Sequence, residues 1–168
     1  MRIKWFSLIR ITGLLLVLLY HFFQTIFPGG FFGVDVFFTF SGFLITALLI
    51  EEFSKKHEID LIGFFRRRFY RIVPPVVLMV LVTMPFTFLV RQDYVAGIGG
   101  QIAGVLGFMT NFYELLTGGS YESQFIPHLF VHNWSLAVEV HYYILWGLAV
   151  WFLSKQAKSN GQLRGMVF

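Results

Sequence analysis

The fold of this chain is decided by residues 31–50, which read FFGVDVFFTFSGFLITALLI. They carry one acid, Asp35, in an otherwise apolar run, which is the length and composition of a helix that crosses a lipid bilayer. Across all 168 residues, 57% are hydrophobic and only 13% are charged. Because so few polar side chains cannot cover a water-facing surface, a soluble monomer is excluded, and the 20% aromatic content excludes a disordered chain. We therefore expect an integral membrane protein.

Other apolar stretches of similar length lie on both sides of this run. We predict spans at 5–27, 31–50, 72–90, 94–113 and 134–153. The stretch 94–113 is rich in glycine, so a re-entrant segment is the alternative to a span there. In residues 51–71 a charged stretch is followed by aromatic and arginine side chains at 64–71, which predicts an amphipathic helix at the membrane surface. The expected fold is an all-α polytopic transmembrane helical bundle of four to five spans over residues 1–153, followed by a polar tail at 154–168.

The positions of the cations predict the orientation. The net charge is +4, and no cysteine is present, which excludes disulfides and thiolate metal sites. The cations lie between apolar blocks and not along a basic arm, so we expect no nucleic-acid partner. By the positive-inside rule, the N-terminus and the amphipathic basic helix are cytosolic. The cations between the second and third spans are Lys55, Lys56, Arg66, Arg67, Arg68 and Arg71.

The first predicted span contains two ionisable residues, Arg10 and His21. They are eleven residues apart, so on a helix they share one face with an axial separation of roughly 16 Å. Ionisable residues inside a span are functional candidates, and a histidine there could act as a general base. The alternative is structural: Arg10 extends to the membrane interface and His21 fills a hydrogen-bonded packing site.

Two acids also lie inside predicted spans. Asp35 would need a partner if it were buried, and His21 or Arg10 on the neighbouring helix is available; alternatively, it lies at the outer interface near a turn. Glu139 is expected to pair with an arginine or histidine from another span. A metal site formed by His128, His132 and Glu139 is a further alternative, although we expect no metal.

An arginine cluster forms the remaining candidate site. Neighbouring arginines on a helix face suit phosphate groups through charge-assisted hydrogen bonds, and the alternative is a topology anchor on anionic lipid. The cluster consists of Arg66, Arg67, Arg68 and Arg71.

The order of these motifs resembles acyltransferase family 3, and most closely the peptidoglycan O-acetyltransferases of Gram-positive bacteria. The resemblance covers residues 5–153. It rests on Arg10-x10-His21, on GVDVFF at 33–38 with SGFLI at 41–45, on Arg67 and Arg68 followed by Arg71 and Pro74, and on HNWSLAVE at 132–139.

The resemblance implies transfer of an acetyl group from acetyl-CoA to a hydroxyl of an extracytoplasmic glycan, peptidoglycan, by a multi-pass protein of the cell membrane. It implies that Arg10, His21, Asp35 and Glu139 are catalytic, with His21 as base or transient acyl acceptor. The arginine cluster would bind coenzyme A, and membrane lipid is a further partner.

Members of this family are longer, with further spans and often an extracytoplasmic esterase-like domain. The chain therefore resembles the N-terminal portion of such an enzyme, and those further parts are expected partners. Two other functions stay open from the residues alone: a small subunit of an ion- or proton-coupled transporter, and an inactive fragment of the acyltransferase.

Overall fold

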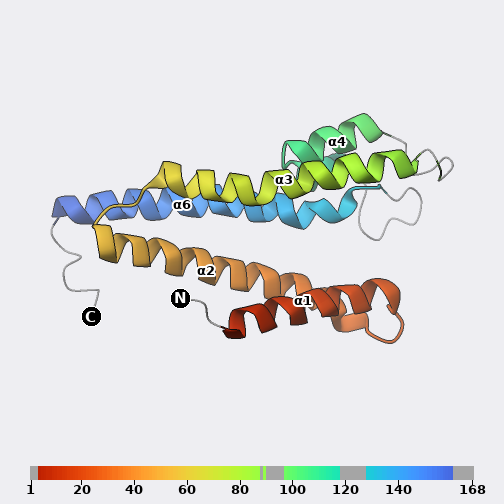
Figure 1. Ribbon diagram of the computed structural model, residues 1–168, viewed down its shortest axis with the longest axis horizontal. Helices are drawn as coiled ribbons and strands as arrows, with labels where there is room; N and C mark the ends of the chain where they lie inside the picture. Colours follow the sequence, from red (N-terminus) through yellow and green to blue (C-terminus); the bar gives the residue numbers. More distant parts are fainter. Residues whose placement is uncertain (1–3, 88, 90–96, 118–127, 161–168) are drawn as a thin grey trace. The chain divides into compact units, whose positions relative to one another are not determined.

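A computed structural model describes residues 4–87, 89, 97–117 and 128–160, and every regular element in them is helical. The chain forms two compact units, Met1–His57 and Glu58–Phe168. The first contains α1 (Lys4–Phe22), η1 (Pro28–Phe31) and α2 (Phe32–Lys56) (Figure 1). The second contains α3 (Leu61–Thr87), α4 (Ile98–Leu106), α5 (Thr110–Thr117), η2 (Val131–Asn133) and α6 (Trp134–Asn160). The prediction of an all-α helical bundle is confirmed.

Among the described residues, three helical segments are long and apolar enough to cross a membrane. They are Pro28–Lys56, Leu61–Thr87 and Val131–Gln156, whereas the apolar part of α1, Leu8–Phe22, is shorter. Many large apolar side chains on these helices are exposed, as expected for surfaces that face lipid. The predicted first span was too long: α1 ends at Phe22, and Pro28 begins the next helical turn.

The first unit is a hairpin of two antiparallel helices, α1 and α2 (Figure 1). The helices approach most closely at two glycines. A Cβ atom on Gly33 would lie 2.6 Å from the carbonyl oxygen of Gly13 and 2.8 Å from Val17 Cγ2. Since neither contact is possible for a real side chain, only glycine at position 33 allows this crossing.

The prediction of a separate amphipathic helix at 51–71 was wrong. Helix α2 ends at Lys56 because the next residue, His57, adopts the left-handed conformation (φ 54°). Asp60 then caps α3, since its Oδ1 accepts a hydrogen bond of 2.9 Å from the backbone N–H of Gly63. The charged residues before the break therefore end α2, and the arginines after it belong to the same helix as the predicted third span.

The core of the second unit lies where α4 and the segment before η2 pack on the C-terminal half of α3. Its buried members are Val76, Val80, Val105 and Phe130. Figure 1 shows α4 beside this part of α3, and α6 runs along α3 in the opposite direction. The α3 helix continues through all of its prolines, Pro74, Pro75 and Pro85.

The described part of residues 94–113 does not form the predicted span. It contains α4 and the start of α5, which have nine and eight residues. At 1.5 Å per residue each helix is only about 12–14 Å long, too short to cross the hydrocarbon core. The chain turns between them, where Phe108 has a φ of 53°. Residues 94–96 lie outside the described residues.

Candidate functional site

Arg10 and His21 both lie on α1, as their spacing predicts. Arg10 is half-buried, and its guanidinium lies 5.3 Å from the ring centroid of Phe40 on α2. This cation–π contact anchors the arginine within the helical hairpin. Arg10 is therefore held by an aromatic ring of the partner helix.

His21 lies near the C-terminal end of α1, and its side chain is exposed. Its Nδ1 is 2.8 Å from the carbonyl oxygen of Val17, and its ring packs edge-on against Tyr20. A carbonyl oxygen can only accept, so Nδ1 carries the proton in this hydrogen bond. In the neutral imidazole the basic lone pair is then on Nε2.

Asp35 lies in the first turn of α2, and its side chain is exposed. Among the described residues, no ion pair joins it to Arg10 or His21, so of the two alternatives for Asp35 the structure favours the position near a turn over the buried pair. Because Gly33 faces α1 at the helix crossing, a residue two positions later points about 200° around α2. The first turn suits a carboxylate, since the N-terminal end of a helix carries partial positive charge.

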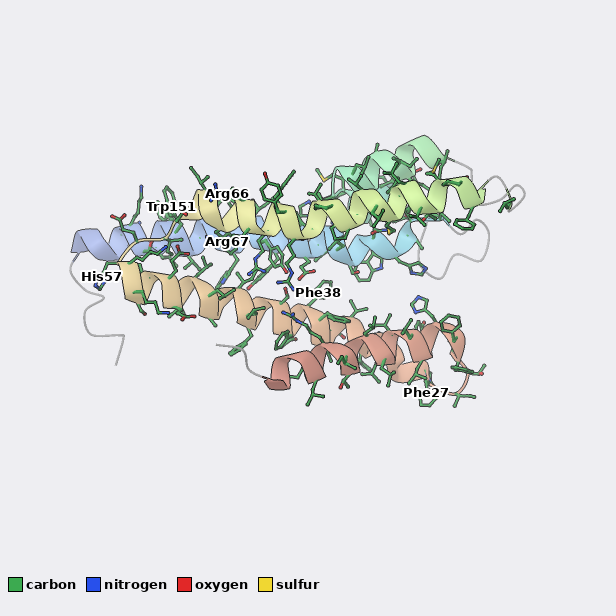
Figure 2. The ribbon with its side chains drawn as sticks, viewed as in Figure 1. Phe27, Phe38, His57, Arg66, Arg67 and Trp151 are labelled. Carbon is green, nitrogen blue, oxygen red and sulfur yellow. The ribbon has the colours of Figure 1, made fainter. Side chains whose placement is uncertain are left out.

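The arginine cluster divides into two parts on α3. Arg66, Arg67 and Arg71 are exposed, and Figure 2 shows Arg66 and Arg67 leaving the N-terminal part of α3 in different directions. Arg68 is half-buried and lies 5.6 Å from the ring centroid of Phe64 and 5.5 Å from that of Tyr143. Arg68 therefore packs between α3 and α6, while the other arginines present their charge at the surface.

Glu139 joins the same network from α6. The hydroxyl of Tyr143 donates a hydrogen bond to Glu139 Oε1, and Arg68 is within electrostatic reach of Glu139. Tyr143 thus connects a cation on α3 to a carboxylate on α6, and the pairing of Glu139 with an arginine or histidine of another span stays a prediction. Sequence reasoning missed Tyr143, although its position one helical turn after Glu139 is a usable signal.

The alternative metal site is not formed. His128 Nδ1 lies 2.7 Å from Glu114 Oε2, so its partner is a carboxylate on α5. Within the described part of the chain, no group of three or more histidine, cysteine, aspartate or glutamate side chains could hold a metal ion.

The chain can now be compared with known proteins. Residues 3–161 match the acyltransferase domain that defines acyltransferase family 3. The chain is 32% identical over 150 residues to the O-acetyltransferase OatA of Staphylococcus aureus strain NCTC 8325, which covers 89% of this chain and 25% of that protein. It is 33% identical over 136 residues to a putative O-acetyltransferase of Staphylococcus aureus strain COL, covering 81% of this chain and 22% of that protein. The chain thus spans about a quarter of the length of these curated relatives. No solved structure matches it.

Proposed function

The chain belongs to acyltransferase family 3, and from this premise we propose that it acts as a membrane O-acetyltransferase. The donor is acetyl-CoA, and the acceptor is a hydroxyl of an extracytoplasmic glycan, peptidoglycan. The observation that carries the proposal is the family match over residues 3–161, nearly the whole chain. The relatives that bear the name O-acetyltransferase support the choice of acyl group and of an oxygen acceptor.

The exposed arginines of α3 are the proposed contact for the phosphates of coenzyme A. Arg66, Arg67 and Arg71 present guanidinium groups at the surface, where a charged ligand can reach them. By the positive-inside rule this end of α3 faces the cytosol, where acyl-CoA is available, and the N-terminus lies on the same side of the cell membrane. Arg68 serves instead to hold α3 to α6 through Tyr143.

His21 is the proposed centre of acyl chemistry. The hydrogen bond to Val17 fixes the tautomer whose Nε2 is basic. That nitrogen can take a proton as a general base or accept the acyl group itself, and both roles need the same atom. Asp35 is proposed to act with His21, because the end of α1 and the first turn of α2 lie at the same end of the hairpin. Arg10 and Glu139 complete the proposed catalytic set.

The proposal is tested in membranes from cells that express the protein. Acetyl-CoA labelled in the acetyl group is supplied with a soluble oligomer of N-acetylglucosamine as acceptor, and alkali-labile label in the oligomer is measured. We expect label above the level of membranes without the protein. Absence of transfer from acetyl-CoA, with transfer from acetyl phosphate, would overturn the proposed donor; absence from both donors would overturn the activity.

A further inference from the structure

A second group of polar side chains is buried in the unit Glu58–Phe168, away from the arginines. Glu114 is 8% exposed, Thr110 is 1% exposed and Gln101 is 1% exposed. Gln101 Oε1 accepts a hydrogen bond of 3.4 Å from the backbone N–H of Phe130, two residues after His128. Buried polar groups are costly and are retained where they stabilise a specific structure or serve function.

The centre of this group is a carboxylate–imidazole dyad. His128 Nδ1 and Glu114 Oε2 are 2.7 Å apart, and their side chains are 11% and 9% exposed. An ionised carboxylate only accepts, so Nδ1 donates and the lone pair of the neutral ring is on Nε2. A carboxylate that holds a histidine in this way fixes the tautomer and orientation that a general base requires.

Thr110 gives an independent sign that this site takes a polar ligand. Four other threonines, Thr46, Thr83, Thr87 and Thr117, donate their hydroxyl to a backbone carbonyl three or four residues earlier. Thr110 begins α5, so its own helix offers no such carbonyl, and its buried Oγ1 makes no hydrogen bond within the described residues. Thr110 is one helical turn before Glu114 and thus on the same face of α5.

The site lies at the end of this unit opposite the arginines. The arginines occupy the first turns of α3, whereas α4 packs on its C-terminal half at Val76 and Val80, and α5 packs on α4. At 1.5 Å per residue, the ten or so residues between these regions separate them by roughly 15 Å along α3. If the arginines face the cytosol, the dyad lies toward the outer face, where a glycan hydroxyl would arrive.

We propose that His128, positioned by Glu114, is the base that accepts the proton of the acceptor hydroxyl. This inference rests on the proposed acetyltransferase function, and of the two roles proposed for His21 it leaves that of acyl acceptor. His128 Nε2 takes the proton as the hydroxyl oxygen forms the new ester bond to the acyl carbon of the donor. The bond from that carbon to the donor's leaving group breaks, and the leaving group departs with the electron pair and is protonated by water. His128 then returns its proton to water.

The test compares two acceptors in membranes that contain the protein: the N-acetylglucosamine oligomer and hydroxylamine. Neutral hydroxylamine is a strong nucleophile that needs no base, so it bypasses His128 while still using the donor side of the reaction. The variants are His128→Gln and Glu114→Gln, and His57→Asn is the matched control, because His57 is exposed and asparagine tolerates its left-handed conformation. The thermal stability of each variant is measured alongside.

We expect His128→Gln to reduce transfer to the sugar by about 10²–10⁴-fold, the range typical of general-base catalysis, and to keep transfer to hydroxylamine. Glu114→Gln should reduce the rate with sugar less, without changing the KM for acetyl-CoA. Unchanged transfer to the sugar, or equal loss with both acceptors, would overturn the inference. Either result would show that the pair of His128 and Glu114 is structural. If the wild type acetylates neither acceptor, the proposed function itself fails, and the inference fails with it.

Discussion

The two units of this chain hold their candidate residues in different ways. In Met1–His57, His21 and Asp35 are exposed, and His21 contacts Val17 and Tyr20 of its own helix. In Glu58–Phe168, side chains from separate elements hold one another: Arg68 packs on Tyr143, Tyr143 donates to Glu139, and His128 bonds to Glu114. The first unit presents exposed reactive groups, whereas the second holds its candidate residues in side-chain networks.

This difference has a consequence for mutagenesis. Substitution of an exposed group on a helical hairpin should change chemistry with little effect on stability. Substitution within a network should change both, because each side chain there also supports its neighbours. Stability and activity should therefore separate in the first unit and change together in the second.

The largest effect on stability is expected at Tyr143, which is 7% exposed. Tyr143→Ala removes a buried ring from between α3 and α6 and should lower the free energy of unfolding by about 3–5 kcal/mol. Tyr143→Phe keeps the ring beside Arg68 and loses only the hydrogen bond to Glu139, which should cost about 1.5 kcal/mol. Denaturant unfolding in detergent measures both. Equal losses would show that the hydroxyl, and not the ring, holds the network.

A smaller effect is expected at the helix crossing of the first unit. Gly33→Ala places a methyl group against the backbone of Gly13 and should destabilise the protein by about 1–3 kcal/mol. Gly99→Ala is the matched control, because no atom lies within 4 Å of its Cβ position, and it should be neutral or stabilise α4 by about 0.5–1 kcal/mol. If both substitutions had the same effect, the close crossing of α1 and α2 would be wrong.

The smallest effect on stability is expected at the exposed arginines. Arg66→Ala with Arg71→Ala should leave unfolding unchanged and weaken acetyl-CoA binding about tenfold, or about 1.4 kcal/mol, with a shallower dependence on salt. Arg68→Lys is the contrasting variant, since lysine loses the planar stacking on Phe64 and Tyr143 and should lower stability. Unchanged affinity and unchanged salt dependence in the double variant, relative to the wild type, would assign the arginines to membrane topology alone.

Much of the fold followed from the sequence because apolar length is a local property. The spans predicted at 31–50, 72–90 and 134–153 each overlap one long helix: Phe32–Lys56, Leu61–Thr87 and Trp134–Asn160. The break at His57 could not be predicted, because it depends on one left-handed residue and on the capping side chain of Asp60. The stretch 94–113 misled because it carries no charge, and Gly107, which lies in the turn at Phe108, is one of five glycines there.

The same distinction between local and long-range information applies to the candidate site residues. The shared helix of Arg10 and His21 followed from their spacing, since both lie on α1. The contacts of His128 with Glu114 join residues fourteen apart on different elements, and no periodicity reports such a pair. The sequence left open whether Asp35 is buried, because its apolar neighbours in the sequence are not its neighbours around the helix; its side chain is exposed.

The central claim is that His21 performs the acyl chemistry in this membrane protein. Acetyl transfer by the His21→Ala variant tests it most directly. Labelled acetate moved from acetyl-CoA to the N-acetylglucosamine oligomer and to hydroxylamine is measured in the same membranes as the wild type. We expect both rates to fall by about 10²–10⁴-fold, at least as much as for loss of a general base, because each acceptor receives the acetyl group from His21. Thermal stability should be unchanged, because the side chain is exposed. Transfer rates in the His21→Ala variant equal to those of the wild type would contradict the proposed role of His21.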